Sequence, residues 1–91
     1  MKELDDLIEA EEIVLFMACQ VLNYSLTARV PKKRITNKIR DMRPKYLRNA
    51  FKSLVSNGFL ILHPSGRNPT YQLTRKGMKA GTILYNRKFG L

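Results

Sequence analysis

Hydrophobic and polar positions follow a helical period most clearly between Arg43 and Gly58. Apolar residues recur there at i, i+3, i+4, i+7 and i+8, which is typical of a helix with one buried face; they are Leu47, Ala50, Phe51, Leu54 and Val55. Pro44 fits the first turn, where its missing N–H costs no hydrogen bond. Asn57-Gly58 fits a left-handed helix stop. The pattern therefore predicts a helix over 44–57.

The N-terminal part of the chain has a second helical stripe, over residues 4–23, formed by Leu4, Leu7, Ile8, Glu11, Leu15, Ala18 and Leu22. The acids in its first turns suit the positive end of a helix dipole; they are either a solvated helix end or a surface that repels DNA. From Ile13 to Leu22 the helix is apolar on nearly every side, which is more apolar surface than one small domain covers. Either this helix is central to the fold or one of its faces meets another subunit, and we favour the second reading.

A short helix is predicted over 31–41, after a connecting segment from Tyr24 to Pro31. Ile35, Ile39 and Met42 have the spacing of inward-facing residues, whereas the cations between them are expected in solvent. A turn at 41–43 then leads into the helix over 44–57. A short helix, a tight turn and a longer helix with a polar face form a helix-turn-helix order.

After Gly58 the pattern becomes that of strands. Residues 59–62 are a short apolar run, and 70–74 alternate, with Tyr71 and Leu73 on one face. Because the residues between them are dense in turn formers, residues 59–74 predict a two-stranded hairpin. Arg67 and Asn68 would lie at its tip, either as solvated side chains or placed to enter a minor groove.

Residues 75–89 predict the last helix, with Thr74 as its N-cap. Its expected apolar side comprises Met78, Ile83, Leu84 and Phe89, and its glycines, Gly77 and Gly81, are expected to weaken it. Its apolar residues, like those of the first helix, exceed what a small core needs. We therefore expect a homodimer joined through the first and last helices, and one domain spanning residues 1–91.

Charge is distributed unevenly along the 91 residues, whose net charge is +10. Residues 2–12 hold six of the seven acids and one base, and the other sixteen bases follow Glu12. Such segregation favours a polyanionic partner, with a generally basic composition as the alternative. No apolar run approaches the roughly 20 residues of a membrane span, and the acidic start argues against a signal peptide. The single Cys19 indicates a reduced, cytoplasmic setting.

The basic segments supply the candidate DNA-binding residues. Arg, Lys and Asn match base edges in the major groove, so the polar face of the 44–57 helix is expected to read bases, through Lys45, Tyr46, Arg48, Asn49 and Lys52. Cations and amides of a preceding helix meet phosphates, and the candidates there are Lys32, Lys33, Arg34 and Lys38, with Arg43 at the turn. Arg67 and Asn68 complete the set.

Residues that support catalysis or metal binding are scarce. The chain has one His and one Cys, far apart, whereas a zinc site needs about four ligands. The turn glycines form no phosphate-binding loop. We therefore expect no enzyme activity, no cofactor, no metal and no small-molecule ligand.

The order helix, helix, turn, helix, hairpin, helix resembles the winged helix-turn-helix transcription regulators. The segment from Leu54 to Leu60 is similar to the end of a recognition helix that runs into a wing strand. The segment from Tyr71 to Gly77 is similar to the Y-x-L-T-x-x-G signature that closes the wing in MarR-like and PadR-like regulators. The resemblance covers roughly residues 10–90, with its closest motifs in 47–77.

This resemblance implies an α+β, mostly α fold: a three-helix core, a two-stranded wing and a C-terminal helix. It also implies major-groove reading by the 44–57 helix and wing contact by Arg67 and Asn68. The chain is similar to small archaeal and viral regulators of this type. It departs from MarR-like and PadR-like proteins in having no long dimerisation helix or ligand pocket, which argues against small-molecule sensing.

The function predicted from these features is sequence-specific binding of double-stranded DNA by a transcriptional regulator. Two alternatives stay open. One is a winged-helix module for protein–protein assembly on the transcription machinery, which would use the excess apolar helices. The other is RNA binding, for which the basic face offers few aromatic stacking platforms, mainly Tyr46.

Overall fold

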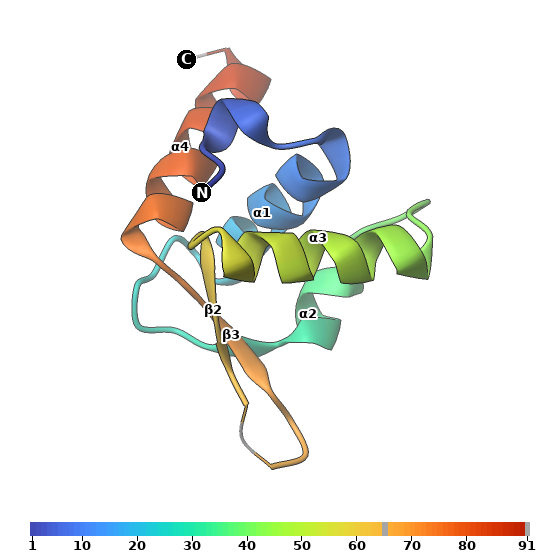
Figure 1. Ribbon diagram of the computed structural model, residues 1–91. Coiled ribbons are helices and arrows are strands. Elements are labelled where there is room, and N and C mark those ends of the chain that lie inside the picture. The colour runs from blue at the N-terminus through green and yellow to red at the C-terminus, as the bar shows by residue number, and fades with distance from the viewer. Residues whose placement is uncertain (65, 91) are drawn as a thin grey trace.

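Four α-helices and a small antiparallel sheet form the protein in a computed structural model that describes residues 1–64 and 66–90 (Figure 1). The elements in chain order are a 3-10 turn (Leu4–Asp6), α1 (Glu9–Val21), β1 (Val30–Pro31), α2 (Lys32–Thr36), α3 (Pro44–Ser56), β2 (Leu60–His63), β3 (Thr70–Leu73) and α4 (Arg75–Phe89). The predicted α+β, mostly α class with a winged helix-turn-helix order is confirmed.

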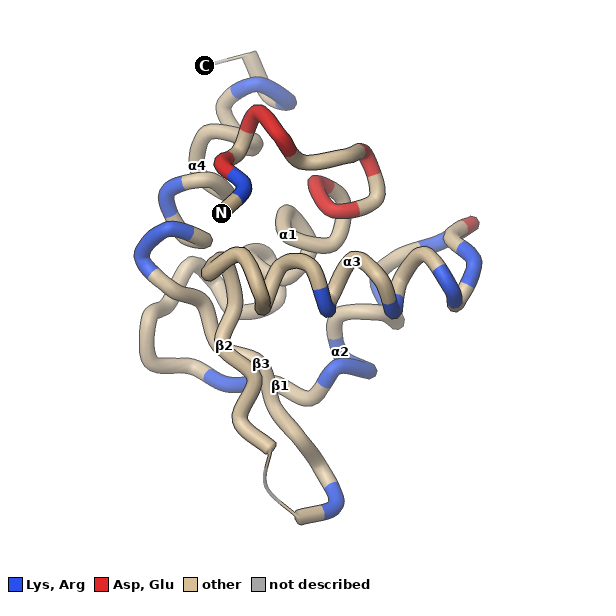
Figure 2. Tube along the Cα trace, viewed as in Figure 1, with Lys and Arg blue, Asp and Glu red and all other residues tan. Residues whose placement is uncertain are grey.

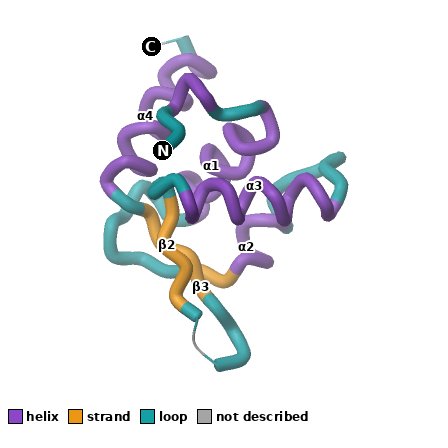
Figure 3. The backbone as a smooth tube through the Cα atoms, viewed as in Figure 1, coloured by secondary structure: helices purple, strands orange, loops and turns teal. Residues whose placement is uncertain are grey.

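The helices gather on one side of the molecule, and the β2–β3 hairpin projects from them as a wing (Figure 3). The core lies between α1 and the elements that surround it, and α1 contacts α2, α3 and α4. Phe51 of α3 and Phe59 before β2 are fully buried beside Leu15 of α1. The central position of α1 explains much of its all-round apolar character, which is one of the two alternatives that the sequence left open.

The sheet has three strands in the order β1-β3-β2, so the predicted two-stranded hairpin is incomplete. Val30 pairs with Tyr71, and Pro31 pairs with Thr70, which adds a strand from the segment expected to be a plain connection. A strand of two residues is too short to show a period of two. Proline is compatible with this edge position because an edge strand can leave a residue without an N–H donor.

The predicted first helix, 4–23, is wrong at both ends. The chain makes a 3-10 turn, extends through Leu7 and Ile8, and begins α1 at Glu9. Two carboxylates cap these turns: Asp6 accepts from the Glu3 N–H (2.9 Å), and Glu11 accepts from the Ile8 N–H (2.8 Å). The acids therefore start two short elements rather than one long helix. Ile8, expected in the buried stripe, is 60% exposed.

The predicted second helix, 31–41, is also too long, because α2 ends at Thr36. The N–H groups of Lys38 and Ile39 donate to carbonyl groups three residues back. Hydrogen bonds of this spacing form 3-10 turns, which end the α-helix. Asp41 then adopts a left-handed conformation with φ of 62°. Ile35 is fully buried as expected, whereas Ile39 and Met42 are half-buried against the core.

Helix α4 begins at the predicted N-cap, because the Thr74 hydroxyl accepts from the Gly77 N–H at 2.9 Å. Its buried face differs from the expected one: Leu84 is buried, but Ile83 and Phe89 are 44% and 55% exposed. Gly77 and Gly81 lie on the buried face, where their small size allows α4 to approach its neighbours. These glycines thus have a packing role that the sequence pattern did not indicate.

Candidate nucleic-acid interface

Helix α3 presents a polar stripe directly opposite its buried residues. Ala50, Phe51 and Leu54 face the core. At 3.6 residues per turn, the residues that point furthest from them are Lys45, Asn49, Lys52 and Ser56, all exposed. Arg48 is exposed beside this stripe. Four of the five residues predicted to read bases are thus grouped on one outward surface.

Arg48 lies on the side of α3 that faces α2. A shallow groove between the two helices is lined by Lys32, Lys33, Thr36, Pro44, Leu47 and Arg48. The Lys32 ammonium lies 5.0 Å from the centroid of the buried Phe51 ring, which holds this cation at the base of the groove. Lys33 lines this groove beside Pro44 in the first turn of α3, and Arg34 is exposed on the same five-residue helix α2.

Tyr46 and Arg43 lie on the opposite side of α3, toward α1. They line a second groove together with Ile8, Ile13, Met42 and neighbouring residues. Tyr46 is 51% exposed. The structure therefore does not group Tyr46 with Arg48, although the two residues are two positions apart in sequence, because such a spacing places side chains on different sides of a helix.

Arg67 and Asn68 are exposed in the loop between β2 and β3, and this loop carries a basic segment at the far end of the wing (Figure 2). The base of the wing is tied to the rest of the fold by polar contacts. His63 Nε2 lies 2.6 Å from Gln72 Oε1, and Gln72 Nε2 donates to the Leu26 carbonyl at 2.5 Å. His63 thus has a role in anchoring the hairpin.

The acids are gathered in one region of the surface, whereas the bases are spread over several elements (Figure 2). The acids of the N-terminal segment and of the start of α1 form an arc on the side away from α2 and the wing (Figure 2). Basic segments follow α2, the turn before α3, α3 itself and the end of the wing, and others lie along α4 (Figure 2). Asp41 is the acid within that basic region, and it is exposed in the turn. The bases of the helix-turn-helix and of the wing therefore lie away from the acidic region (Figure 2).

A polar network that the sequence analysis did not identify fixes the C-terminal end of α3. The Lys2 backbone N–H donates to Asn57 Oδ1 (2.8 Å), and Lys76 Nζ donates to the carbonyl groups of Lys2 (2.6 Å) and Asn57 (2.9 Å). Glu11, only 2% exposed, forms an ion pair with Lys2 at 3.2 Å. The N-terminal segment thus joins α1, α3 and α4.

Glu11 is the buried carboxylate of this network. Burial on its own raises the pKa of a carboxyl group. Hydrogen bonds from the Ser53 hydroxyl and the Ile8 N–H, together with the Lys2 ammonium, outweigh that effect and lower the pKa of Glu11 below its ordinary value. The spacing of Glu11 three residues after Ile8, the N-cap of α1, was a usable signal for a capping role. The sequence pattern was instead interpreted as a helical stripe that includes Glu11, with the acids left as either a solvated helix end or a surface that repels DNA.

Other chemistry is limited in the part of the chain that the structure describes. Within residues 1–64 and 66–90, no three His, Cys, Asp or Glu side chains are grouped to hold a metal ion. None of the helices described is both long enough and apolar enough to cross a membrane. Burial raises the pKa of the Cys19 thiol to about 12, which keeps it protonated and unreactive.

Comparison with known proteins extends the description of the fold. No protein-family model and no curated protein matches the sequence. Among solved structures, F-93 of SSV1 is similar, with a TM-score of 0.74 and 18% identity over 93% of this chain and 87% of that chain. AF1382 from Archaeoglobus fulgidus has a TM-score of 0.66 and 21% identity over 92% of this chain and 91% of its own.

TubR, a type III plasmid segregation protein, is also similar, with a TM-score of 0.55 and 18% identity over 90% of this chain and 89% of that chain. At these identities the likenesses show the fold, which the three proteins share with this chain over nearly its whole length. The protein is thus a small winged helix. None of the three matches singles out the MarR-like or PadR-like type that the wing motif resembles.

Proposed function

We propose that this winged helix is a cytoplasmic transcriptional regulator that binds double-stranded DNA in a sequence-specific manner. The observation that carries the proposal is the outward stripe of Lys45, Asn49 and Lys52 on α3, with Arg48 beside it and the cations of α2 next to Arg48. An α-helix fits the major groove, where Arg and Asn side chains form bidentate contacts with guanine and adenine.

The proposed roles divide into phosphate contact and base reading. Lys32, Lys33, Arg34 and Lys38 would neutralise phosphates beside the N-terminus of α3, where backbone N–H groups also favour anions. Arg48 and Asn49 would read bases, with Lys45 and Lys52 on the same face. Arg67 and Asn68 would contact the minor groove from the wing. Arg43 and Tyr46, on the α1 side, would contact the DNA backbone at the edge of the footprint.

We also propose that the protein acts as a homodimer through α1 and α4. Support comes from large apolar residues that the core does not use: Ile13, Tyr85 and Phe89 are 37%, 36% and 55% exposed on these two helices. Contiguous exposed apolar patches are uncommon on monomers and mark interaction sites. A two-fold dimer would present two copies of α3 to a pseudo-palindromic operator.

Fluorescence anisotropy with genomic duplex fragments tests the proposal, with matched single strands and duplex RNA as competitors and several salt concentrations. Neutralisation of about five phosphates per protomer predicts a slope of log affinity against log salt of roughly −4 to −5, doubled for a dimer. A preference for one duplex sequence that survives excess competitor supports the proposal. Equal, weak binding to every polyanion contradicts it.

Weak DNA binding that does not depend on salt would instead favour the second candidate, a protein-assembly module. The observation behind that candidate is the groove on the α1 side of α3, where Ile8, Ile13 and Tyr46 leave 60%, 37% and 51% of their surfaces exposed. Large exposed apolar and aromatic side chains of this kind are typical of protein interfaces. Preferential binding of duplex RNA would favour the third alternative.

A further inference from the structure

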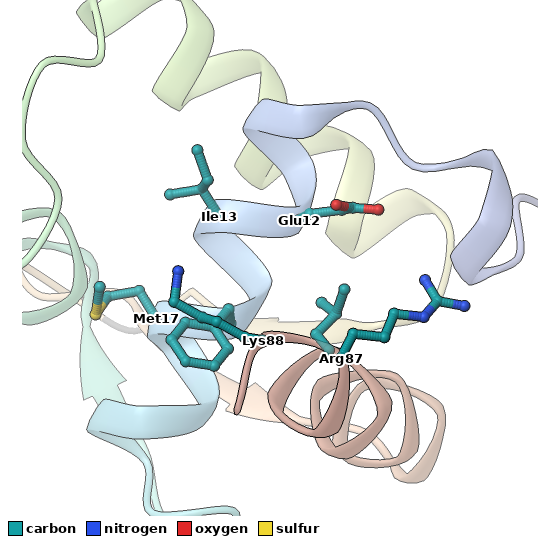
Figure 4. Close-up of a pocket in the computed structure, with 7 residues that line it drawn as sticks. Glu12, Ile13, Met17, Arg87 and Lys88 are labelled. Atoms are coloured by element: carbon teal, nitrogen blue, oxygen red, sulfur yellow. The ribbon is translucent and has the colours of Figure 1, made fainter. Parts of the chain in front are cut away.

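A groove between α1 and α4 combines an apolar floor with charged walls. Glu12, Ile13, Phe16 and Met17 of α1 line it, and Leu84, Arg87 and Lys88 of α4 line the opposite wall (Figure 4). The Phe16 ring lies 6.5 Å from the ring of Tyr85 and 6.4 Å from that of Phe89, centroid to centroid. The groove thus opens onto an aromatic cluster that remains accessible to a partner.

Charged side chains of opposite sign flank the groove. Glu12 of α1 and Arg87 of α4 point to one side of it, whereas the Lys88 ammonium of α4 points to the opposite side, toward Met17 (Figure 4). Among the described residues, neither Glu12 nor Lys88 forms an ion pair within the chain, and Lys88 Nζ lies 5.6 Å from the centroid of Phe16. Arg87 is bound to Asp5 at 3.1 Å. An acid and an ammonium group are therefore available for a partner.

Symmetry determines which groups of two such grooves can meet. In a two-fold dimer each surface faces a rotated copy of itself. If the axis crosses the groove, α1 lies on α1 and α4 lies on α4, so that walls of the same kind face each other. If the axis runs along the groove, each α1 lies on the α4 of the other copy at the same level. Glu12 then faces the groups that stand opposite it in its own groove.

We propose that two copies pack with the two-fold axis along this groove, so that Glu12 of each copy pairs with the partner subunit's Lys88. This inference rests on the proposed homodimer and adds its geometry. Charge complementarity carries the choice of axis, because this arrangement alone brings both unpaired groups against opposite charge. The apolar floor supplies the contact area, and the paired charges fix the register of one copy on the other.

Two variants, each with one charge reversed, test the pairing of Glu12 with the partner subunit's Lys88. Glu12→Lys places two cations against each other in its homodimer, and Lys88→Glu places two carboxylates together, so we expect each variant to dimerise roughly tenfold more weakly than wild type. Mixed with each other, the two variants restore opposite charge at both contacts. Lys79→Glu, which makes the same charge change on an exposed part of α4 outside the groove, is the matched control.

Native mass spectrometry and sedimentation of the full chain, at low and moderate salt, measure the outcome. An excess of Glu12→Lys/Lys88→Glu heterodimer over the statistical proportion, absent in mixtures with Lys79→Glu, supports the exchanged pairing. If wild type is a dimer but the variants mix in the statistical proportion, the proposed direction of the two-fold axis is wrong, whereas the proposed homodimer is still supported. A monomeric wild type would overturn both. DNA binding is measured separately by fluorescence anisotropy. A failure of the protein to bind DNA can therefore be distinguished from a failure of the proposed dimer geometry.

Discussion

Gly81 of α4 lies directly against Cys19 of α1. A Cβ atom built on Gly81 would lie 2.2 Å from the Cys19 sulfur and 3.1 Å from its Cβ, well inside van der Waals contact. Both residues are buried. The approach of α4 to α1, and with it the shape of the groove between them, therefore depends on the absence of a side chain at residue 81.

Gly81→Ala is predicted to destabilise the protein by about 1–3 kcal/mol through overpacking, although alanine favours a helix by up to about 1 kcal/mol over glycine. Urea denaturation followed by circular dichroism measures the change. Cys19→Ala removes the sulfur that an alanine methyl group would meet, so the double variant is expected to recover part of the loss. If the changes in the free energy of unfolding of the two single variants simply add in the double variant, the contact between residue 81 and the Cys19 sulfur does not cause the loss of stability.

The contacts of Thr74 and Gly77 explain why threonine and glycine occupy these positions of the Y-x-L-T-x-x-G segment. The Thr74 hydroxyl accepts the Gly77 N–H at 2.9 Å and donates toward the Gly58 carbonyl at 2.5 Å, so it joins the start of α4 to the turn that ends α3. A Cβ on Gly77 would lie 2.0 Å from the Phe59 carbonyl oxygen. The motif thus connects α3, the wing and α4 at one point.

Thr74→Ala is predicted to cost about 1–2 kcal/mol, the usual effect of losing an N-cap, and Thr74→Ser to retain most of the stability because it keeps the hydroxyl. Thermal unfolding at fixed protein concentration compares the two variants. Thr82→Ala is the control, since that hydroxyl is exposed and only donates to the Met78 carbonyl within α4. Equal losses for Thr74→Ala and Thr82→Ala would contradict the capping role.

The sequence predicted the elements with strong local signals. The five-residue apolar stripe and the Asn57-Gly58 stop located α3, which runs from Pro44 to Ser56 with Gly58 at a φ of 79°. Thr74 located the start of α4. In these cases the residues that define the element lie within it, so the period and the capping residues were sufficient.

Features that depend on distant contacts could not be predicted in this way. Strand β1 exists because Val30 meets Tyr71, forty-one positions later in the printed sequence. Gly81 appears as a weak helix residue until Cys19 is known to lie against it. That α1 covers the side of α3 that carries Tyr46 follows from where the two helices pack. Residue type and spacing alone do not specify these neighbours.

Glu11 makes stability depend on pH in a defined direction. Its pKa in the folded protein lies below the ordinary value of 4.5, so the ionised carboxylate stabilises the fold above that pH. This contribution is lost as the pH falls through the lowered pKa, because both the folded and the unfolded states then bind the proton. Glu11→Gln, which lacks the charge that pairs with Lys2, is predicted to lose about 1–3 kcal/mol at neutral pH.

Denaturant unfolding of wild type and Glu11→Gln from neutral pH to well below pH 4.5 tests this prediction. The difference between the two proteins is expected to shrink as the solution becomes acidic. Glu9→Gln, an exposed acid in the same first turn of α1, should differ little from wild type throughout. A difference between wild type and Glu11→Gln that stays constant with pH would assign the effect of residue 11 to packing alone.

Arg48 and Lys33 lie on either side of the groove between α3 and α2, and they are predicted to contribute differently to DNA binding. Arg48→Ala should cost about 1–3 kcal/mol on the preferred duplex and relax the choice of base at one position. Lys33→Ala should weaken binding to all duplexes alike and reduce the magnitude of the salt slope by about 1, since one phosphate contact is lost.

Anisotropy titrations with the preferred duplex and with a set of single-base variants, each at several salt concentrations, separate these two effects. Lys79→Ala removes an exposed cation of α4 outside the proposed interface and should change neither base preference nor salt slope. The roles are reversed if Lys33→Ala alters base preference while Arg48→Ala does not. Because Arg48 and Lys33 share one groove, that reversal would mean that α2 rather than α3 enters the major groove.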